Sequence, residues 1–240
     1  MGRRADHEGV SELQTTLNHL VRSRSDANPA FNALLHDYAE FHAVLAALAG
    51  LVTVGLVLLS VFSWRRWRRA PRATFERSTF RAFAVSSALV SLCLAVIVLA
   101  NLGNALHPRD GFASAIPVLG TPRPGTDQAQ VQRATDAWLK SGRAEASPPL
   151  QRKIDERLSW QRPKAVVCSL LAIAFVLLSL RIWSRLIARA RERGRRRTLK
   201  DRAAAAAGWV AVACTLVLAV MAVANTQASV APMTLTVLYG

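Results

Sequence analysis

Four apolar runs, each about 20 residues long and without an acid or base in its interior, constrain this chain more than any other feature. They lie at about 41–63, 82–106, 165–180 and 203–225. A helix of that length crosses the hydrocarbon core of a bilayer, whereas a soluble protein of 240 residues has no way to bury four uniformly apolar helices. The sequence therefore predicts an all-α integral membrane protein with four transmembrane helices.

The charge distribution excludes one obvious function. In a soluble protein a formal net charge of +16 would suggest a nucleic-acid partner. Here the basic residues flank apolar runs, so we expect them to set orientation and to contact anionic lipid, with no nucleic acid bound. The 27 Arg against 4 Lys and the abundant Ala are typical of a GC-rich bacterial genome.

The basic residues also predict topology. The short loops 64–81 and 181–202 carry 7 and 10 Lys or Arg, whereas 1–40 carries 4, 107–164 carries 10 over a much longer stretch, and 226–240 carries none. The positive-inside rule places the two short loops in the cytoplasm and both termini outside the bacterial inner membrane. Because 1–40 lacks the apolar core of a secretory signal, we expect the first run to be a permanent anchor.

Two short motifs occur twice along the chain. Leu58–Trp64 reappears as Leu177–Trp183, with a shared Leu-Leu-Ser start and a shared Trp at the end, and Ala100-Asn101 reappears as Ala224-Asn225. The repetition predicts two tandem hairpins that cross the membrane in the same sense, a parallel repeat related by an axis along the membrane normal.

Small residues line one face of the second and fourth runs, at the same offset as the repeated Ala-Asn pair. In lipid, such stripes let helix backbones approach closely. We therefore expect these two runs to pack together at the centre and the other two to face lipid or a partner. The stripes consist of Ala84, Ser87, Ser91 and Ala95 in the second run and Gly208, Ala211, Thr215 and Ala219 in the fourth.

Asn101 and Asn225 end the two predicted central helices at equivalent depths. A buried amide needs a hydrogen-bond partner, so one interpretation is a contact between them across the repeat axis. The alternative is that both lie at the wet interface.

The polar stretches predict short elements outside the membrane. Apolar residues at helical spacing predict helices over 11–21, 126–141 and 147–158, prolines predict a loop over 107–125, and alternation over 233–239 is typical of a strand. We expect the three polar stretches to form a small helical extracytoplasmic cap.

The predicted organisation has five parts. They are an extracytoplasmic amphipathic segment (1–40), a first hairpin (41–106) with its Arg-rich loop, an extracytoplasmic loop with short helices (107–164), a second hairpin (165–225) with its Arg-rich loop, and an extracytoplasmic tail (226–240).

No set of residues predicts catalysis. His36, Glu40 and His42 lie around the start of the first run, and His36 and Glu40 share a helical face, but no further ligand set accompanies them. The runs contain no internal acid or base, which disfavours a proton-coupled transporter. We therefore expect no enzyme, no cofactor and no metal.

The favoured function is a non-enzymatic accessory or scaffold subunit of a bacterial membrane complex, with a protein partner or a second copy of the chain. One alternative is a small oligomeric channel or transporter, and another is a signalling module that uses its Arg-rich cytoplasmic loops. The arginines assigned to lipid phosphate or to topology are Arg65, Arg66, Arg68, Arg69, Arg195, Arg196 and Arg197.

Overall fold

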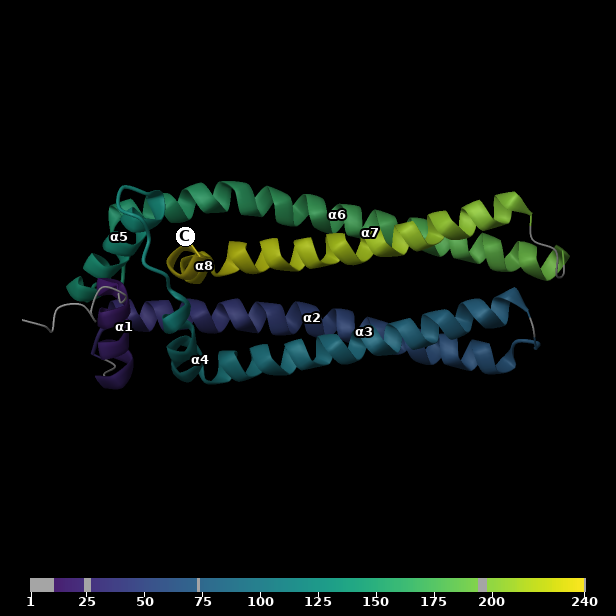
Figure 1. Ribbon diagram of the computed structural model, residues 1–240, viewed down its shortest axis with the longest axis horizontal. Helices are drawn as coiled ribbons and strands as arrows, with labels where there is room; N and C mark the ends of the chain where they lie inside the picture. Colours follow the sequence, from purple (N-terminus) through teal and green to yellow (C-terminus); the bar gives the residue numbers. More distant parts are fainter. Residues whose placement is uncertain (1–10, 24–26, 73, 194–197, 240) are drawn as a thin grey trace, which may run out of the picture. The chain divides into compact units, whose positions relative to one another are not determined.

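The computed structural model describes residues 11–23, 27–72, 74–193 and 198–239, and most of them are helical (Figure 1). Within these ranges it contains no β-strand. The elements in chain order are α1 (Glu12–Ser23), α2 (Pro29–Arg69), α3 (Phe75–Leu106), α4 (Pro108–Ala115), the 3-10 turn η1 (Ile116–Val118), α5 (Asp127–Ser141), α6 (Pro148–Arg193), α7 (Leu199–Val230) and α8 (Pro232–Tyr239). The predicted all-α secondary structure is confirmed.

Four of these helices, α2, α3, α6 and α7, are long enough and apolar enough to cross a membrane. Each contains an 18-residue stretch with at most two charged residues. A helix also satisfies its own backbone hydrogen bonds, which a segment in lipid must do. The number of predicted membrane-spanning helices is therefore confirmed by their length and composition.

Large apolar side chains on these helices face outward. Leu51 is 71% exposed, Leu99 is 67% exposed and Val220 is 67% exposed. Leaving such surface in water costs roughly 25 cal/mol for each Å². The apolar stretches thus present the kind of surface that acyl chains cover.

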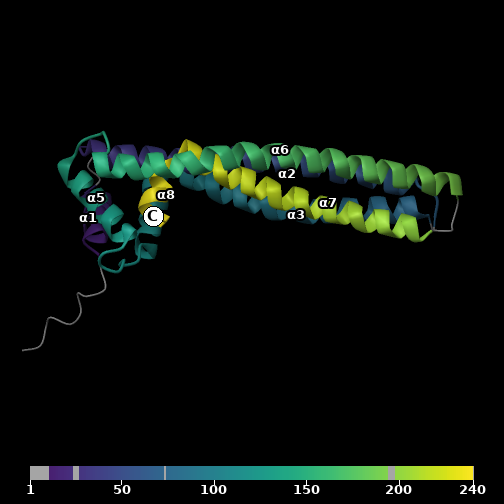
Figure 2. The same ribbon diagram turned by 90° about the horizontal axis from the view of Figure 1, so that it is seen from above.

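The chain divides into two compact units, of which unit 2 comprises Leu45–Leu99 and Pro163–Asn225. Within it, α2 forms a hairpin with α3, and α6 forms a hairpin with α7 (Figures 1 and 2). The end of α2, the start of α3, the end of α6 and the start of α7 all lie at the same end of unit 2 (Figure 1). The two hairpins therefore run in the same sense.

Three aromatic rings join α3, α6 and α7 within unit 2. Phe83 stacks on Trp209 at 5.3 Å between ring centroids, and Trp183 meets both rings edge-on at 5.0 and 5.2 Å. Trp183 also lies against Gly208, where an added Cβ would be 3.0 Å from the indole ring. Glycine at 208 is therefore what lets the indole pack directly on the α7 backbone.

Replacing Gly208 with alanine is expected to destabilise unit 2 by about 1–3 kcal/mol, because the rigid indole of Trp183 must move away from the new methyl group. Thermal unfolding in detergent measures the change. The matched control is Gly55→Ala on α2, where an added Cβ meets nothing within 4 Å. Equal melting temperatures for the two variants would contradict this account of the packing.

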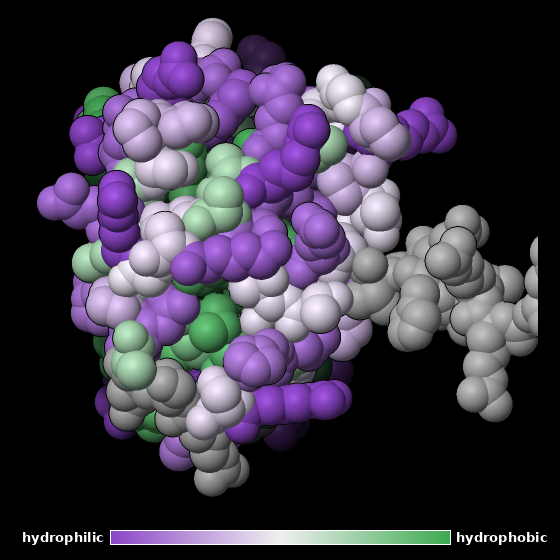
Figure 3. Space-filling model, turned by 90° about the vertical axis from the view of Figure 1, so that its left-hand side faces the viewer, coloured by the Kyte–Doolittle hydropathy of each residue, from purple (hydrophilic) through white to green (hydrophobic). Residues whose placement is uncertain are grey.

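Unit 1 is assembled from three stretches far apart in sequence, Met1–Val44, Ala100–Arg162 and Thr226–Gly240. They share one apolar core, whose fully buried members include Leu17 of α1, Phe31 of α2, Phe112 of α4, Trp138 of α5 and Leu150 of α6. Figure 3 shows one face of unit 1, on which hydrophilic side chains predominate and hydrophobic atoms are visible in recesses between them. This pattern is typical of a water-exposed domain.

Local polar contacts explain where the short helices of unit 1 begin. Ser11 and Gln14 form a capping box at the start of α1, in which each side chain accepts a backbone N–H of the other residue, at 3.2 and 3.0 Å. The Gln14 amide also donates to the carbonyl of Ile116, at 3.2 Å, and to that of Leu119. Thr126 caps α5 by accepting from the N–H of Ala129 (3.3 Å). One glutamine thus both starts α1 and ties it to η1.

The predicted strand at 233–239 is wrong, because these residues form helix α8. Pro232 suits the first position of a helix, where its missing N–H is not needed. Asp37 of α2 then accepts the next two N–H groups, from Met233 at 3.4 Å and Thr234 at 2.6 Å. The capping group lies almost two hundred positions away in sequence, so the local alternation did not reveal it.

Two other boundaries differ from the prediction. The proline-rich stretch 107–125 contains α4 and η1, since Pro108 occupies the first turn of α4, where proline is tolerated. Helix α6 runs from Pro148 through Pro163 without ending, so the predicted short helix and the third span are one element.

Candidate functional site

The two small-residue stripes lie on α3 and α7 of unit 2, and most of their members are covered. Ala84, Ser87 and Ser91 on α3 are buried, as are Gly208 and Ala211 on α7, whereas the remaining three positions are half-buried. Among the contacts of this face, the Ser60 hydroxyl donates to the Ala84 carbonyl at 2.9 Å and so joins α2 to α3. The half-buried members are Ala95, Thr215 and Ala219. Direct contact between the stripes remains a prediction.

The two asparagines make different contacts. In unit 1 the Asn101 carboxamide oxygen is 2.6 Å from Nδ1 of His42. Asn225 donates from its amide nitrogen to the Met221 carbonyl one turn earlier, at 2.6 Å. A hydrogen bond between Asn101 and Asn225 stays a prediction.

His36, Glu40 and His42 do not form a single site. His36 pairs with Glu40 at 3.3 Å on an exposed helix face, while His42 contacts Asn101 and lies 4.4 Å from the ring of Tyr38. In the part of the chain that the structure describes, no group of three or more His, Cys, Asp or Glu side chains lies close enough to hold a metal ion.

Several arginines between α2 and α3 lie against aromatic rings. The Arg66 guanidinium is 5.4 Å from the centre of Phe62, and those of Arg77 and Arg81 are 5.9 and 6.0 Å from the centre of Trp67. Such cation–π contacts help to hold a guanidinium in place, and Arg77 also donates to the Ala70 carbonyl at 3.2 Å. The predicted residues Arg195, Arg196 and Arg197 lie outside the described residues.

Sequence reasoning missed a groove in unit 1 between α5 and α6. It has two adjoining lobes, of about 330 and 350 Å³, which share Val131, Lys153 and Glu156 as lining residues. Apolar and charged side chains line the first lobe, among them Leu150 and Arg152, and the second is bounded by Thr236 of α8. We call these two lobes together the α5–α6 groove.

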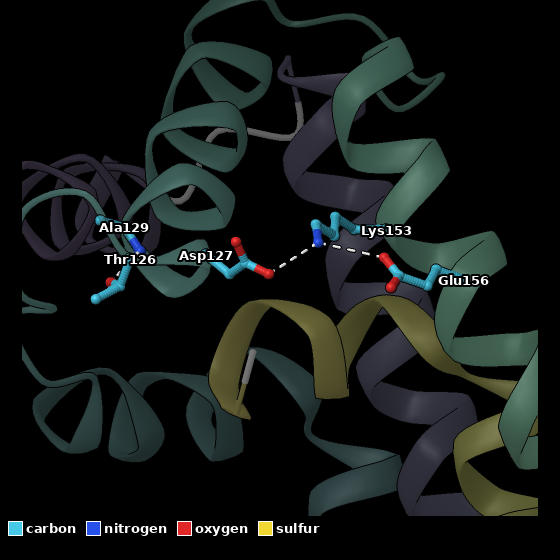
Figure 4. Close-up of polar contacts among 5 residues, drawn as sticks. All are labelled: Thr126, Asp127, Ala129, Lys153 and Glu156. Carbon is cyan, nitrogen blue, oxygen red and sulfur yellow. Dashed lines mark hydrogen bonds and ion pairs between the residues drawn. The ribbon is translucent and has the colours of Figure 1, made fainter.

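An ion-pair bridge crosses the α5–α6 groove between its lobes. The Lys153 ammonium is 3.1 Å from a carboxylate oxygen of Asp127 on α5 and 3.2 Å from one of Glu156 on α6 (Figure 4). These two hydrogen bonds raise the pKa of Lys153. Because the two carboxylates are 80% and 64% exposed, solvent screens the bridge and it stabilises the fold little. It is therefore weak enough to open when a ligand offers better contacts.

The second lobe contains an arginine, Arg157, that forms no salt bridge with the described residues. The Arg157 side chain is half-buried, yet no carboxylate of the described residues forms a salt bridge with it. Burial lowers the pKa of this guanidinium, although it stays protonated. Beside it, the Trp160 side chain is 67% exposed. A half-desolvated cation next to an exposed indole suits an anionic ligand with an apolar part.

A second recess, near the start of α1, is less suited to a ligand. It holds about 310 Å³. Its polar side chains already serve the fold: Asp136 accepts from Thr16 at 2.6 Å and pairs with Lys140 at 2.6 Å, and Gln132 donates to the Gly120 carbonyl. The α5–α6 groove is therefore the better candidate.

Asp37 fixes the start of α8, the helix that forms one wall of the groove. Besides the two backbone N–H groups, its carboxylate accepts the Thr234 hydroxyl at 2.7 Å. Burial raises the pKa of Asp37, which precedes the first apolar run, against the opposing effect of these hydrogen bonds. A desolvated carboxylate in this position is stabilised by the positive end of the α8 dipole.

Replacing Asp37 with alanine is expected to cost about 1–2 kcal/mol, the usual effect of losing a helix cap, and to loosen α8 in particular. Hydrogen–deuterium exchange of the amides in 233–239 should become faster in the variant. Asp155→Ala serves as the control, since this exposed aspartate of α6 accepts a single side-chain bond, from Gln151 at 3.1 Å. Equal exchange in both variants would show that α8 does not depend on Asp37.

Comparison with known proteins gives no assignment: no protein-family model, curated protein or solved structure matches the chain.

Proposed function

We propose that this protein is a non-enzymatic accessory or scaffold subunit of a bacterial membrane complex, and that unit 1 holds its partner. The observation that carries the proposal is the α5–α6 groove, which lies in a unit with its own apolar core. A chain that only anchored itself in lipid would need neither the groove nor the apolar core of unit 1. The partner is a second protein or a second copy of this chain.

The proposed arrangement follows the sequence repeat and the charge pattern. Two tandem hairpins cross the bacterial inner membrane in the same sense, unit 1 lies on the extracytoplasmic side, and the Arg-rich connections lie in the cytoplasm. The arginines near Phe62 and Trp67 contact the phosphates of anionic lipid, with the aromatic rings at the level of the headgroups.

A photocrosslinking amino acid at Gln130 tests the partner-holding function. Gln130 is exposed and lines the α5–α6 groove, so illumination of native membranes should give one reproducible adduct, with another protein or with a second copy. Ala144 is exposed in unit 1 outside the groove and is the control position. Adducts that are absent at Gln130, or equally frequent at both positions, would refute a partner at this groove.

Orientation can be tested with the arginines of the first short loop. Replacing the four arginines in 65–69 with glutamine removes the strongest cytoplasmic signal of the first hairpin, so the hairpin should invert in a large fraction of molecules. Labelling of single introduced cysteines from outside intact cells measures the orientation.

The matched control for orientation replaces the four arginines in 109–143 with glutamine. These belong to the loop proposed to lie outside, where removing positive charge strengthens the native orientation. Unchanged orientation in the first variant would show that the arginines in 65–69 do not determine topology.

A further inference from the structure

The inference concerns what occupies the second lobe of the α5–α6 groove. At the centre of the groove, Lys153 is paired with both Asp127 and Glu156, so these three side chains carry a formal net charge of −1. Arg157 lies one helical turn beyond Lys153 on α6 and has no such pair among the described residues. The Arg157 guanidinium has therefore lost part of its hydration and has gained no salt bridge from the described residues in return.

We infer that the second lobe binds an acidic peptide segment of a partner protein, with a carboxylate of the peptide on the Arg157 guanidinium and an apolar side chain against Trp160. The planar fork of an arginine matches a carboxylate in a two-bond geometry. The exposed indole and the buried Val131, which lines the same lobe, supply apolar contact. The inference rests on the proposed function, of which it specifies the ligand.

The size of the lobe agrees with a peptide that lies along the groove. Its volume of about 350 Å³ is at the lower end of the range for ligand pockets, roughly 300–1,000 Å³. The lobe therefore has room for a few side chains of a peptide whose backbone stays largely at the surface. Because the Lys153 bridge is weak, a longer peptide can displace it and extend into the first lobe.

A lipid phosphate fits Arg157 less well. Arg157 precedes the third apolar run, which begins at Ala165, by eight residues, or about 12 Å of helix. The headgroup region extends only about 5–7 Å beyond the hydrocarbon core on each side. In addition, helical side chains tilt toward the N-terminus of their helix, which for α6 is away from that run. Arg157 is thus directed to a ligand beyond the lipid surface.

The test uses the full-length chain in nanodiscs of phosphatidylcholine. The probes are fluorescein-labelled eight-residue peptides in which leucine alternates with aspartate, and a matched set in which asparagine replaces aspartate. Fluorescence anisotropy should show binding of the acidic set at least tenfold tighter than of the amide set, as expected for a charge-assisted pair.

Three variants assign the binding to one side chain. Arg157→Gln should weaken binding of the acidic peptides about tenfold or more, and Arg157→Lys should weaken it less, because the charge remains while the fork is lost. Arg143→Gln, an exposed position outside the groove, should bind as the unaltered protein does. Equal melting temperatures of the variants separate recognition from folding.

The inference is overturned if acidic and amide peptides bind alike, or if Arg157→Gln and Arg143→Gln behave alike. It is also overturned if Arg157→Gln loses binding of vesicles containing phosphatidylglycerol and not of peptides, since the site would then belong to lipid. Failure of this inference can be distinguished from failure of the proposed function. If a partner still crosslinks at Gln130 in the Arg157→Gln variant, the scaffold function is retained and only the role of Arg157 is refuted.

Discussion

The constraint on which the rest of this structure depends is that a chain in lipid must satisfy its backbone hydrogen bonds internally. Four apolar stretches meet this demand as helices. In the proposed topology each hairpin crosses the membrane twice, so the stretches before, between and after the hairpins emerge on the same side. The composition of unit 1, which contains Met1–Val44, Ala100–Arg162 and Thr226–Gly240, agrees with this proposal.

The two units are stabilised by different interactions. Unit 1 has the core of a water-soluble domain, with Phe31, Phe112 and Trp138 fully covered by side chains from several helices, so burial of apolar surface is its main driving force. In unit 2 the large apolar side chains face outward, and close packing at Gly208 and around Trp183 holds the helices together. In lipid, where apolar burial gains little, close approach of backbones matters more.

The groove between α5 and α6 contains a weak ion-pair bridge and an arginine without a salt bridge. The bridge from Lys153 to Asp127 and Glu156 closes the groove at little energetic gain, and Arg157 remains half-buried without a carboxylate from the described residues. A fold that needed Arg157 only for stability would gain by pairing it or by exposing it. Its position agrees with the proposed ligand, whose carboxylate would pair with the guanidinium.

By itself, the sequence determined the features that depend on neighbouring residues. Runs of apolar residues determined the four spans, and the small residues on one face of two runs marked positions such as Ala84, Ser87 and Gly208, which the structure buries. These features follow from helical periodicity, which can be read from the sequence of one segment alone.

The tertiary structure alone decided the features that need a distant partner. Residues 233–239 became a helix because Asp37 caps it from α2, and the groove exists because α5 and α6 meet with α8 beside them. The sequence alone did not single out Arg157 or Trp160, for no sequence pattern shows which carboxylates will be out of reach. A contact between residues far apart in the chain is fixed by packing, and packing is decided by all the segments together.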